Sequence, residues 1–126
     1  MSGERILVVE DNLKNLKLVR DVLEYAGYVV VEADTGERGI ELATEAMPDL
    51  VLMDLQLPGM DGTETLRRLR EIPTTKGIPV VAVTAFAMEA DREKALANGF
   101  DGFVEKPISV RVLARQVERF LNEERP

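Results

Sequence analysis

The sequence of 126 residues contains no cysteine and no histidine. Disulfide bonds, zinc fingers, thiolate nucleophiles, Ser-His-Asp triads and imidazole metal sites are therefore excluded. Any chemistry of this chain has to use carboxylates, hydroxyls, lysines and backbone groups. A metal held by such oxygen ligands would be a hard cation such as Mg²⁺, Mn²⁺ or Ca²⁺.

Long hydrophobic runs are also missing. A membrane-crossing helix needs about 20 consecutive apolar residues, and the apolar runs here are far shorter. The first residues lead into a short apolar stretch at 6–9 rather than into the core of a signal peptide. We therefore expect a cytoplasmic protein that does not bind a membrane.

Positive charge is scarce beside negative charge. Sixteen Lys and Arg stand against 23 Asp and Glu, which gives a net charge of −7. The densest basic cluster is Arg67, Arg68 and Arg70, and Glu64 and Glu71 flank it. Because this charge balance repels a polyanion and no basic face stands out, nucleic acid is not expected as a partner.

Length and composition suit one compact domain. With 45% hydrophobic and 31% charged residues, the chain has an ordinary globular composition. No linker, low-complexity tract or internal repeat interrupts it. We expect residues 1–126 to form a single domain that acts without an appended output domain.

Short apolar runs rich in β-branched residues predict strands. Since these runs do not alternate apolar with polar residues, we expect both faces of the sheet to be covered by helices. The predicted strands are 6–9, 29–31, 50–53 and 80–83, with a weaker candidate at 102–104.

Segments with helical spacing follow each of these runs. The fourth such segment, 89–98, is rich in polar residues. The other four are predicted from apolar stripes: Leu13, Leu16, Val19, Leu23 and Ala26; Ile40, Ala43 and Met47; Leu66 and Leu69; and Val110, Leu113, Ala114, Val117, Phe120 and Leu121.

Capping residues support these helices. The predicted caps are Gly27 and Gly99 at C-termini, Asp34 with Glu37 as a capping box, and Asp61 and Ser109 at N-termini. Either Asp11 or Asn12 could cap the first helix. Five β-α units in a row predict an open α/β sheet, and they are too few for a (β/α)8 barrel.

Polar residues follow the ends of the predicted strands. In an open α/β sheet the ligand site lies beyond the carboxyl ends of the strands, so these residues should gather at one edge. They are Glu10 and Asp11, Asp54, Thr84, and Glu105 and Lys106. Clustered carboxylates repel one another unless a cation neutralises them, so the set predicts a divalent ion, and Mg²⁺ suits it best.

Asp54 is the expected nucleophile of this cluster. It ends the wholly apolar run 50–53, which would hold it rigidly, and a carboxylate can attack phosphorus to form an acyl phosphate. Lys106 would pair with a phosphoryl oxygen and Thr84 would donate a hydrogen bond to another. Taken singly, Thr84 and Lys106 have ordinary structural explanations, but as a set at successive strand ends these residues indicate a site.

Four motifs stand out in the sequence: Glu10-Asp11, the segment 53–62, the step Val83-Thr84-Ala85, and Lys106-Pro107. Together they resemble the receiver domains of two-component response regulators, and the resemblance covers essentially the whole chain. Within the family, the sequences at 10–12, 80–88 and 106–109 are most similar to stand-alone cell-cycle regulators of the DivK type and to receivers of hybrid kinases.

The resemblance implies a three-layer flavodoxin-like (βα)5 fold with a parallel five-stranded sheet in the order 2-1-3-4-5. It implies that a histidine kinase or histidine phosphotransfer protein phosphorylates Asp54. It also implies Mg²⁺ held by Asp11, Asp54 and the backbone carbonyl of Gln56, with Glu10 reaching the ion through water, and a cis bond before Pro107.

The expected output is a change of protein contacts. By analogy, Thr84 moves toward the phosphoryl group and Phe103, where the family often has tyrosine, turns inward. Phe86 and Gln56 flank the site and should influence how water reaches the acyl phosphate. The implied partners are the phosphodonor and a downstream protein target, and the implied state is a monomer that dimerises weakly when phosphorylated.

Other functions fit the sequence less well. A receiver that acts unphosphorylated would not need the complete set of site residues, and a phosphatase of the haloacid-dehalogenase type needs Asp-x-Asp, whereas position 56 is Gln. A dinucleotide-binding fold needs a glycine-rich loop where this chain has Glu10 and Asp11. We expect no enzyme activity beyond the protein's own phosphorylation and dephosphorylation.

Overall fold

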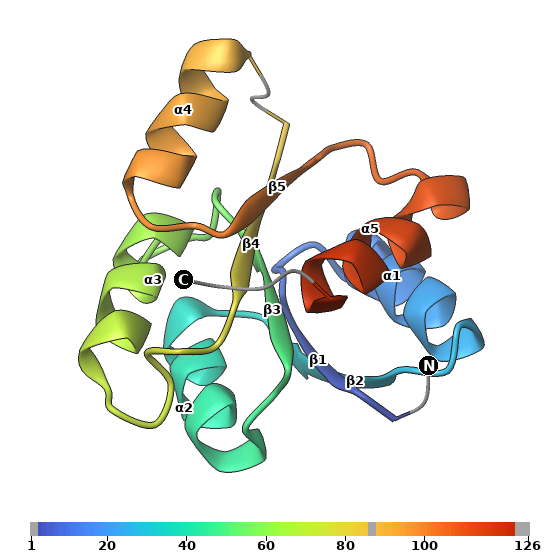
Figure 1. The fold of residues 1–126 in the computed structure, drawn as a ribbon, viewed down its shortest axis with the longest axis horizontal. Helices are drawn as coiled ribbons and strands as arrows, with labels where there is room; N and C mark the ends of the chain where they lie inside the picture. The colour runs from blue at the N-terminus through green and yellow to red at the C-terminus, as the bar shows by residue number, and fades with distance from the viewer. Residues whose placement is uncertain (1–2, 86–87, 123–126) are drawn as a thin grey trace.

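The structure is a computed structural model that describes residues 3–85 and 88–122. Strands and helices alternate along this part of the chain (Figure 1). The strands are β1 (Arg5–Val9), β2 (Val29–Ala33), β3 (Leu50–Asp54), β4 (Val80–Thr84) and β5 (Gly102–Glu105). The helices are α1 (Leu13–Tyr25), α2 (Gly36–Ala46), α3 (Gly62–Glu71), α4 (Glu89–Ala97) and α5 (Val110–Asn122).

The strands form one parallel sheet in the order β2-β1-β3-β4-β5, as the family resemblance implies. β3, β4 and β5 each run one residue past the carboxyl end predicted from the apolar pattern, and β2 runs two residues past it. Backbone pairing continues where the side chains turn polar, so Asp54 pairs with Val83 inside the sheet. Asp54 and Thr84 are therefore strand residues rather than loop residues.

The sheet is covered on both faces along its centre, as predicted, because every residue of β3 and β4 is buried. The same prediction is wrong for β2. Val29 is 47% exposed and the next three residues are half-buried. β2 is an edge strand, so one side has no neighbouring strand and the helices cover it incompletely.

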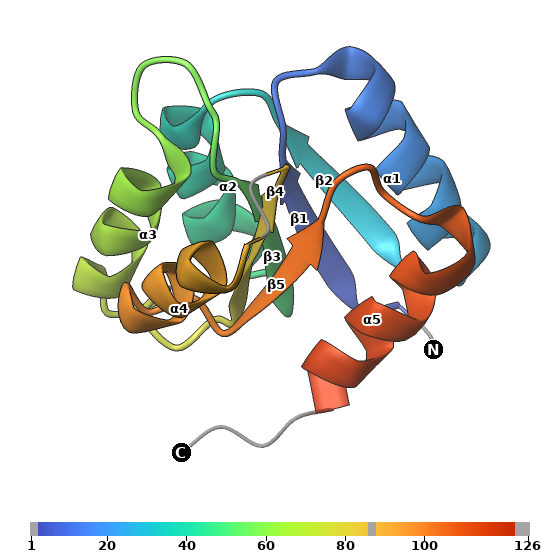
Figure 2. The same ribbon diagram turned by 90° about the horizontal axis from the view of Figure 1, so that it is seen from above.

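Two hydrophobic clusters pack against the two faces of the sheet (Figure 2). One cluster joins the sheet to α1 and α5 through Leu23, Leu113 and Val117. The other joins it to α2, α3 and α4, mainly through Leu66 and Leu69. The molecule thus has three layers, with α1 and α5 on one side and the remaining helices on the other.

α1 begins after Asn12, whose side chain accepts a hydrogen bond from the Asn15 N–H, so Asn12 rather than Asp11 is the cap. Gly27 follows the helix with φ of 99°, which explains the predicted stop. The predicted stripe is wrong at both ends. Leu13 is 74% exposed because it lies on the first turn beyond the sheet, and Ala26 is an exposed C-cap.

α2 departs from the predicted capping box. Thr35 is the N-cap, and its hydroxyl accepts the Arg38 N–H at 3.0 Å, whereas Asp34 lies one residue earlier. Met47 is also not part of the helix. It takes a left-handed conformation with φ of 49° as the C-cap and is 50% exposed, because the chain must turn there to enter β3.

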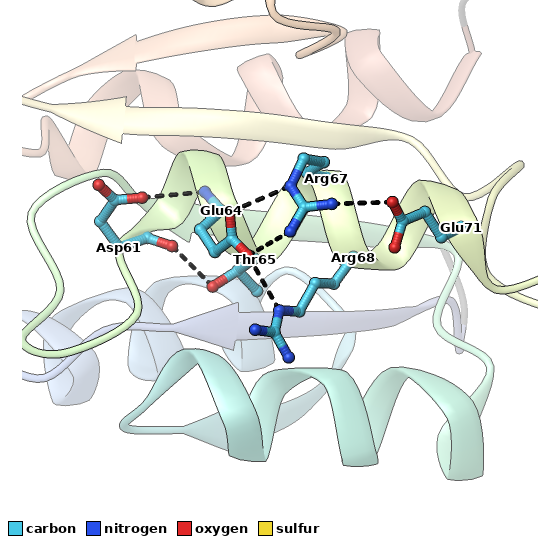
Figure 3. A network of polar contacts seen from close by, with 6 residues as sticks. All are labelled: Asp61, Glu64, Thr65, Arg67, Arg68 and Glu71. Atoms are coloured by element: carbon cyan, nitrogen blue, oxygen red, sulfur yellow. Dashed lines mark hydrogen bonds and ion pairs between the residues drawn. The ribbon is translucent and has the colours of Figure 1, made fainter.

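α3 is capped by Asp61 as predicted, through its bond to the Glu64 N–H at 2.9 Å. Its outer face carries a network of ion pairs in which Arg67 and Arg68 bind Glu64, and Arg67 also binds Glu71 (Figure 3). Arg70, the third member of the basic cluster noted in the sequence, pairs instead with Asp101 at 2.9 Å, so each arginine of the cluster has a carboxylate partner.

The last two helices differ in how they attach to the sheet. Within α4, Ala95 is the one buried residue, and Leu96 is 54% exposed. α5 buries Leu113, Val117 and Phe120. The Ser109 carbonyl accepts the Leu113 N–H at 3.0 Å, so α5 starts where predicted, while a cap by the Ser109 side chain stays a prediction.

A small cavity of about 80 Å³ lies where β1 begins and α5 ends. It is lined by Glu4, Tyr28, Glu118, Leu121 and Asn122. This edge of the sheet is opposite the carboxyl ends of the strands.

Candidate functional site

β1 ends at Val9 and delivers two acidic residues to the carboxyl edge of the sheet. The Glu10 N–H donates to the Ala33 carbonyl at 2.9 Å, so backbone pairing with β2 extends one residue past the end of β1, and Glu10 is only 4% exposed. Its Oε2 accepts the N–H of Asn12 at 3.1 Å. Asp11 is exposed, so this carboxylate faces solvent beside the buried Glu10.

Asp54 is the last residue of β3, in the middle of the sheet, and is 2% exposed. Its Oδ1 accepts the backbone N–H of Gln56 at 2.9 Å. One oxygen from each of Glu10, Asp11 and Asp54 lies within 4.8 Å of the other two. The predicted convergence of the three carboxylates is therefore observed.

This acidic cluster fits a hard divalent cation. All three residues offer carboxylate oxygens, the ligands that Mg²⁺ and Ca²⁺ prefer, and the exposed Asp11 leaves the cluster open to solvent. The backbone carbonyl of Gln56, which the family resemblance adds to the ligand set, stays a prediction.

Lys106 supplies the positive charge of the site. It follows β5, and its Nζ lies 3.0 Å from Asp54 Oδ2 and 3.3 Å from Glu10 Oε1. The Lys106 N–H donates to the Thr84 carbonyl at 2.8 Å, which ties the residue to β4. The peptide bond to Pro107 is cis, as the resemblance implies.

Burial and charge shift the pKa values of these groups. Burial raises the pKa of Glu10, and the nearby Asp54 carboxylate raises it further, although the Asn12 N–H opposes both. Burial acts to lower the pKa of Lys106, but its hydrogen bond to Asp54 and the charges of Asp54 and Glu10 outweigh this effect and raise it. Lys106 is therefore a stable cation between two carboxylates.

Thr84 ends β4 and is fully buried. Its hydroxyl Oγ1 accepts the side-chain Nε2–H of Gln56 at 3.2 Å. The sequence analysis expected Gln56 to offer its backbone carbonyl to the metal and to flank the site, where it would influence the access of water. It missed this contact with Thr84, because neither spacing nor composition indicates where an exposed amide points.

Phe103 is half-buried on β5 and packs against the α2–α4 side of the core. The Arg92 guanidinium of α4 stacks over its ring at 5.2 Å and also lies 3.7 Å from Glu105. Sequence reasoning missed Arg92 too. Phe86, predicted to flank the site, lies outside the described residues.

A model of the response regulator receiver domain matches residues 6–118 of this chain. The match spans the five strands, apart from Arg5 of β1, and most of α5. The chain belongs to the response regulator receiver domain family.

Relatives of this receiver domain include polar-differentiation response regulators. DivK of Brucella ovis is 40% identical over 118 residues, which cover 94% of this chain and 96% of the relative. DivK of Brucella abortus matches to the same extent. The predicted likeness to DivK-type regulators is therefore confirmed.

Solved structures show the same fold. The receiver domain of the sensor histidine kinase PA1611 of Pseudomonas aeruginosa, which holds a magnesium ion in its active site cleft, is 32% identical with a TM-score of 0.87. The match covers 97% of this chain and all of that one. The chemotaxis response regulator CheY4 of Vibrio cholerae is 25% identical with a TM-score of 0.89, over 94% of this chain and 99% of that one.

The described part of this receiver domain was also searched for membrane-spanning segments. Within residues 3–85 and 88–122, no helix combines the length and apolar character that crossing a membrane requires.

Proposed function

We propose that this receiver domain accepts a phosphoryl group on Asp54 from a histidine kinase or histidine phosphotransfer protein and signals through changed protein contacts. The observation that supports this is the position of the Asp54 carboxylate, which is buried, adjacent to two other carboxylates and in contact with Lys106. The match to the DivK response regulators spans 94% of this chain and 96% of the relative and supports the same function.

The proposed reaction is a transfer between two side chains. A carboxylate oxygen of Asp54 attacks the phosphorus of phosphohistidine, the new P–O bond forms as the P–N bond breaks, and the electron pair of that bond stays on the histidine nitrogen. Lys106, already at 3.0 Å from Asp54 Oδ2, pairs with a phosphoryl oxygen. The Thr84 hydroxyl donates to another phosphoryl oxygen.

We propose that Glu10, Asp11, Asp54 and the Gln56 carbonyl hold Mg²⁺. When bound, the ion would offset the negative charge of the carboxylates and of the incoming phosphoryl oxygens. Fixing Asp54 at the end of a wholly buried strand keeps its carboxylate in place for the donor. We propose no further enzyme activity for this domain.

Intact mass after incubation with acetyl phosphate tests this proposal. With Mg²⁺, we expect an adduct with the mass of one phosphoryl group that is lost in base, as acyl phosphates are. Asp54→Asn should abolish the adduct. Asp34→Asn is the matched control, because it makes the same change of charge at an exposed residue outside the cluster.

The rate at which the adduct forms should also depend on Mg²⁺ and on the positive charge of Lys106. Without Mg²⁺, or in a Lys106→Met variant that still folds, we expect slower formation. An adduct of equal amount on Asp54→Asn would place the acceptor elsewhere. No adduct on the folded wild type from acetyl phosphate or from a phosphorylated histidine donor would favour a receiver that acts unphosphorylated.

Docking of the donor is proposed for the basic face of α1. The sequence offers Lys14, Lys17 and Arg20 on this face, but Lys17 pairs with Asp21 at 2.6 Å and Arg20 pairs with Glu32 at 2.7 Å. Lys14 is exposed and has no ion pair within residues 3–85 and 88–122. It is therefore the cation most available to an acidic donor surface.

Charge reversal at Lys14 tests this docking face. We expect Lys14→Glu to slow transfer from the cognate protein donor more than Lys17→Glu does, since Lys17 is already neutralised. Phosphorylation by acetyl phosphate should be unchanged. The exposed Lys76, which lies between α3 and β4, provides Lys76→Glu as a control, and an equal slowing by this variant would indicate general charge repulsion.

A further inference from the structure

Gln56 contacts both ends of the proposed phosphorylation switch. Its backbone N–H donates to Asp54 Oδ1 at 2.9 Å, and its side-chain amide bonds to the Thr84 hydroxyl at 3.2 Å. The reverse pairing, from Thr84 Oγ1 to Gln56 Oε1, is 3.4 Å. One residue thus connects the phosphoacceptor on β3 with the hydroxyl at the end of β4.

We propose that Gln56 is a positioning residue for Thr84. Its amide holds the Thr84 hydroxyl in the unphosphorylated protein, and this hydrogen bond breaks when the hydroxyl turns to a phosphoryl oxygen on Asp54. The inference rests on the proposed function and adds a residue that sets how readily the switch occurs.

The backbone of Thr84 is held by hydrogen bonds to its neighbours, so its side chain is the part that can change partners. Its carbonyl accepts the Lys106 N–H at 2.8 Å, and β4 pairs with strands on both sides. Because Thr84 is fully buried, its hydroxyl exchanges partners among groups already beside it. The Gln56 amide is one such group, and the proposed phosphoryl position next to Lys106 is another.

The space around Gln56 allows the amide to be released at low cost. Gln56 and Thr84 line a cavity of about 220 Å³ between α3 and α4. Thr63, Asp91, Lys94 and Asn98 supply polar groups to its lining, and Leu55, Ala95 and Phe100 supply apolar ones. Because Gln56 is exposed, an amide that leaves Thr84 can bond to water or to one of these polar side chains and is not left unpaired.

The direction of the effect follows from which state the bond stabilises. The Gln56–Thr84 bond exists in the unphosphorylated arrangement and is given up in the other. An interaction made in one of two states shifts the equilibrium toward that state. Removing the Gln56 amide should therefore favour the arrangement in which Thr84 meets the phosphoryl group.

A double-mutant cycle with isosteric variants tests this. Gln56→Met keeps the length of the side chain but removes the amide, and Thr84→Val keeps the shape but removes the hydroxyl. Affinity for beryllofluoride, a mimic of the phosphoryl group, is measured in the presence of Mg²⁺. We expect Gln56→Met to tighten binding about fivefold, the effect of one net hydrogen bond, and to leave binding unchanged when Thr84 is already Val.

A second cycle uses the protein without Mg²⁺ or beryllofluoride. We expect the effects of the two substitutions on unfolding to be non-additive, because each removes the same hydrogen bond. If Gln56→Met acted only by changing how water reaches the site, its effect on unfolding would be the same with Thr or Val at residue 84, and the two substitutions would be additive. Thr84→Ala replaces Thr84→Val if the latter does not fold.

The possible outcomes distinguish a failure of this inference from a failure of the proposed function. If the wild type binds beryllofluoride but Gln56→Met weakens binding, or has the same effect with Thr or Val at residue 84, the role inferred for Gln56 is wrong and the proposed function stands. If the wild type does not bind beryllofluoride while the metal-free cycle is non-additive, the hydrogen bond exists but the switch, and with it the proposal, is overturned.

Discussion

Gly62 shows how closely β3 and the following helix α3 approach each other. A Cβ added at this residue would lie 2.5 Å from the Asp54 carbonyl oxygen and 2.9 Å from Leu55 Cα. Both are backbone atoms, so the contact is relieved only by moving the start of α3 or the segment that carries Asp54. In an exposed helix, alanine is favoured over glycine by about 1 kcal/mol. At residue 62 we expect glycine to be favoured over alanine, because the added Cβ would clash with the backbone.

Gly62→Ala should lower the free energy of unfolding by about 1–3 kcal/mol, the usual cost of overpacking. It should also weaken Mg²⁺ binding, because the clash displaces the backbone of Asp54. Denaturant titration and metal titration measure the two effects. Gly77→Ala is the control, since nothing lies within 4 Å of a Cβ there. Similar effects at both glycines would contradict the steric explanation.

Lys106 is the cation that offsets the charge of Glu10 and Asp54. We expect Lys106→Met to lower the free energy of unfolding at neutral pH by about 1–3 kcal/mol, less than for a fully buried pair because the side chain is 17% exposed. The deficit should shrink as the pH falls, because burial already raises the pKa of Glu10 and its protonation removes one of the repelling charges. Mg²⁺ should shrink it as well. A deficit independent of pH and of Mg²⁺ would indicate lost packing instead.

At the scale of elements, α4 is held least firmly. Ala95 is its one buried residue within Glu89–Ala97, and Met88 caps it without a side-chain hydrogen bond. Its contact with β5 includes the stacking of Arg92 on Phe103. Phe103 has no hydroxyl group to form a hydrogen bond with α4. Its ring therefore interacts with α4 through this cation–π contact.

We expect α4 and β5 to change most in amide hydrogen exchange when the protein is phosphorylated or binds beryllofluoride with Mg²⁺. Elements with few buried anchors open at the lowest cost. Arg92→Ala should increase exchange in α4 before phosphorylation, while Arg115→Ala on α5 serves as the control. Unchanged protection in α4 and β5, with changes elsewhere, would contradict this assignment.

The outer face of α3 offers a test of surface electrostatics (Figure 3). The hydrogen bonds of Arg67 and Arg68 lower the pKa of Glu64 from 4.5 to about 2. A carboxyl whose pKa is lower in the folded state stabilises the fold above its unfolded pKa, and this contribution is lost as the pH falls through the folded value.

Glu64→Gln should therefore lower the melting temperature slightly above pH 5, and the gap to the wild type should close as the pH approaches about 2. The gap should also narrow in about 1 M salt, where the screening length is about 3 Å. Thermal unfolding followed by circular dichroism measures both. A gap that ignores pH and salt would assign the effect to helix propensity.

Predicting elements from the sequence succeeded where the signal is local. Asp61 caps α3 as predicted, and Gly27 stops α1 with its φ of 99°, although Ala26 one residue earlier is the C-cap. Such signals are reliable because capping depends on a few neighbouring residues. Leu13 and Met47 were misplaced because apolar spacing continues past the point where a helix ends or leaves the core. Thr35 replaced Asp34 as a cap because both residue types cap helices and the backbone decides between them.

At the scale of the whole molecule, the candidate site was predictable because topology assembles it. β1 and β3 are neighbouring strands, so the backbone alone brings Glu10 and Asp54 to adjacent positions at the same edge of the sheet. The contacts that sequence reasoning missed, Gln56 with Thr84 and Arg92 with Phe103, depend on where flexible side chains point. Such contacts leave no trace in spacing or composition.

The cavity shared by Glu4 and Asn122 places the two ends of the described chain beside each other, at the edge of the sheet opposite Asp54. A domain in which residues near the two ends, here Glu4 and Asn122, line one cavity can enter and leave a host protein at neighbouring points, as many inserted domains do. Nothing attached there would stand between a phosphodonor and the acidic cluster. The domain therefore has the geometry of a portable module, able to be spliced into an exposed loop of another protein while its chemistry continues to face outward.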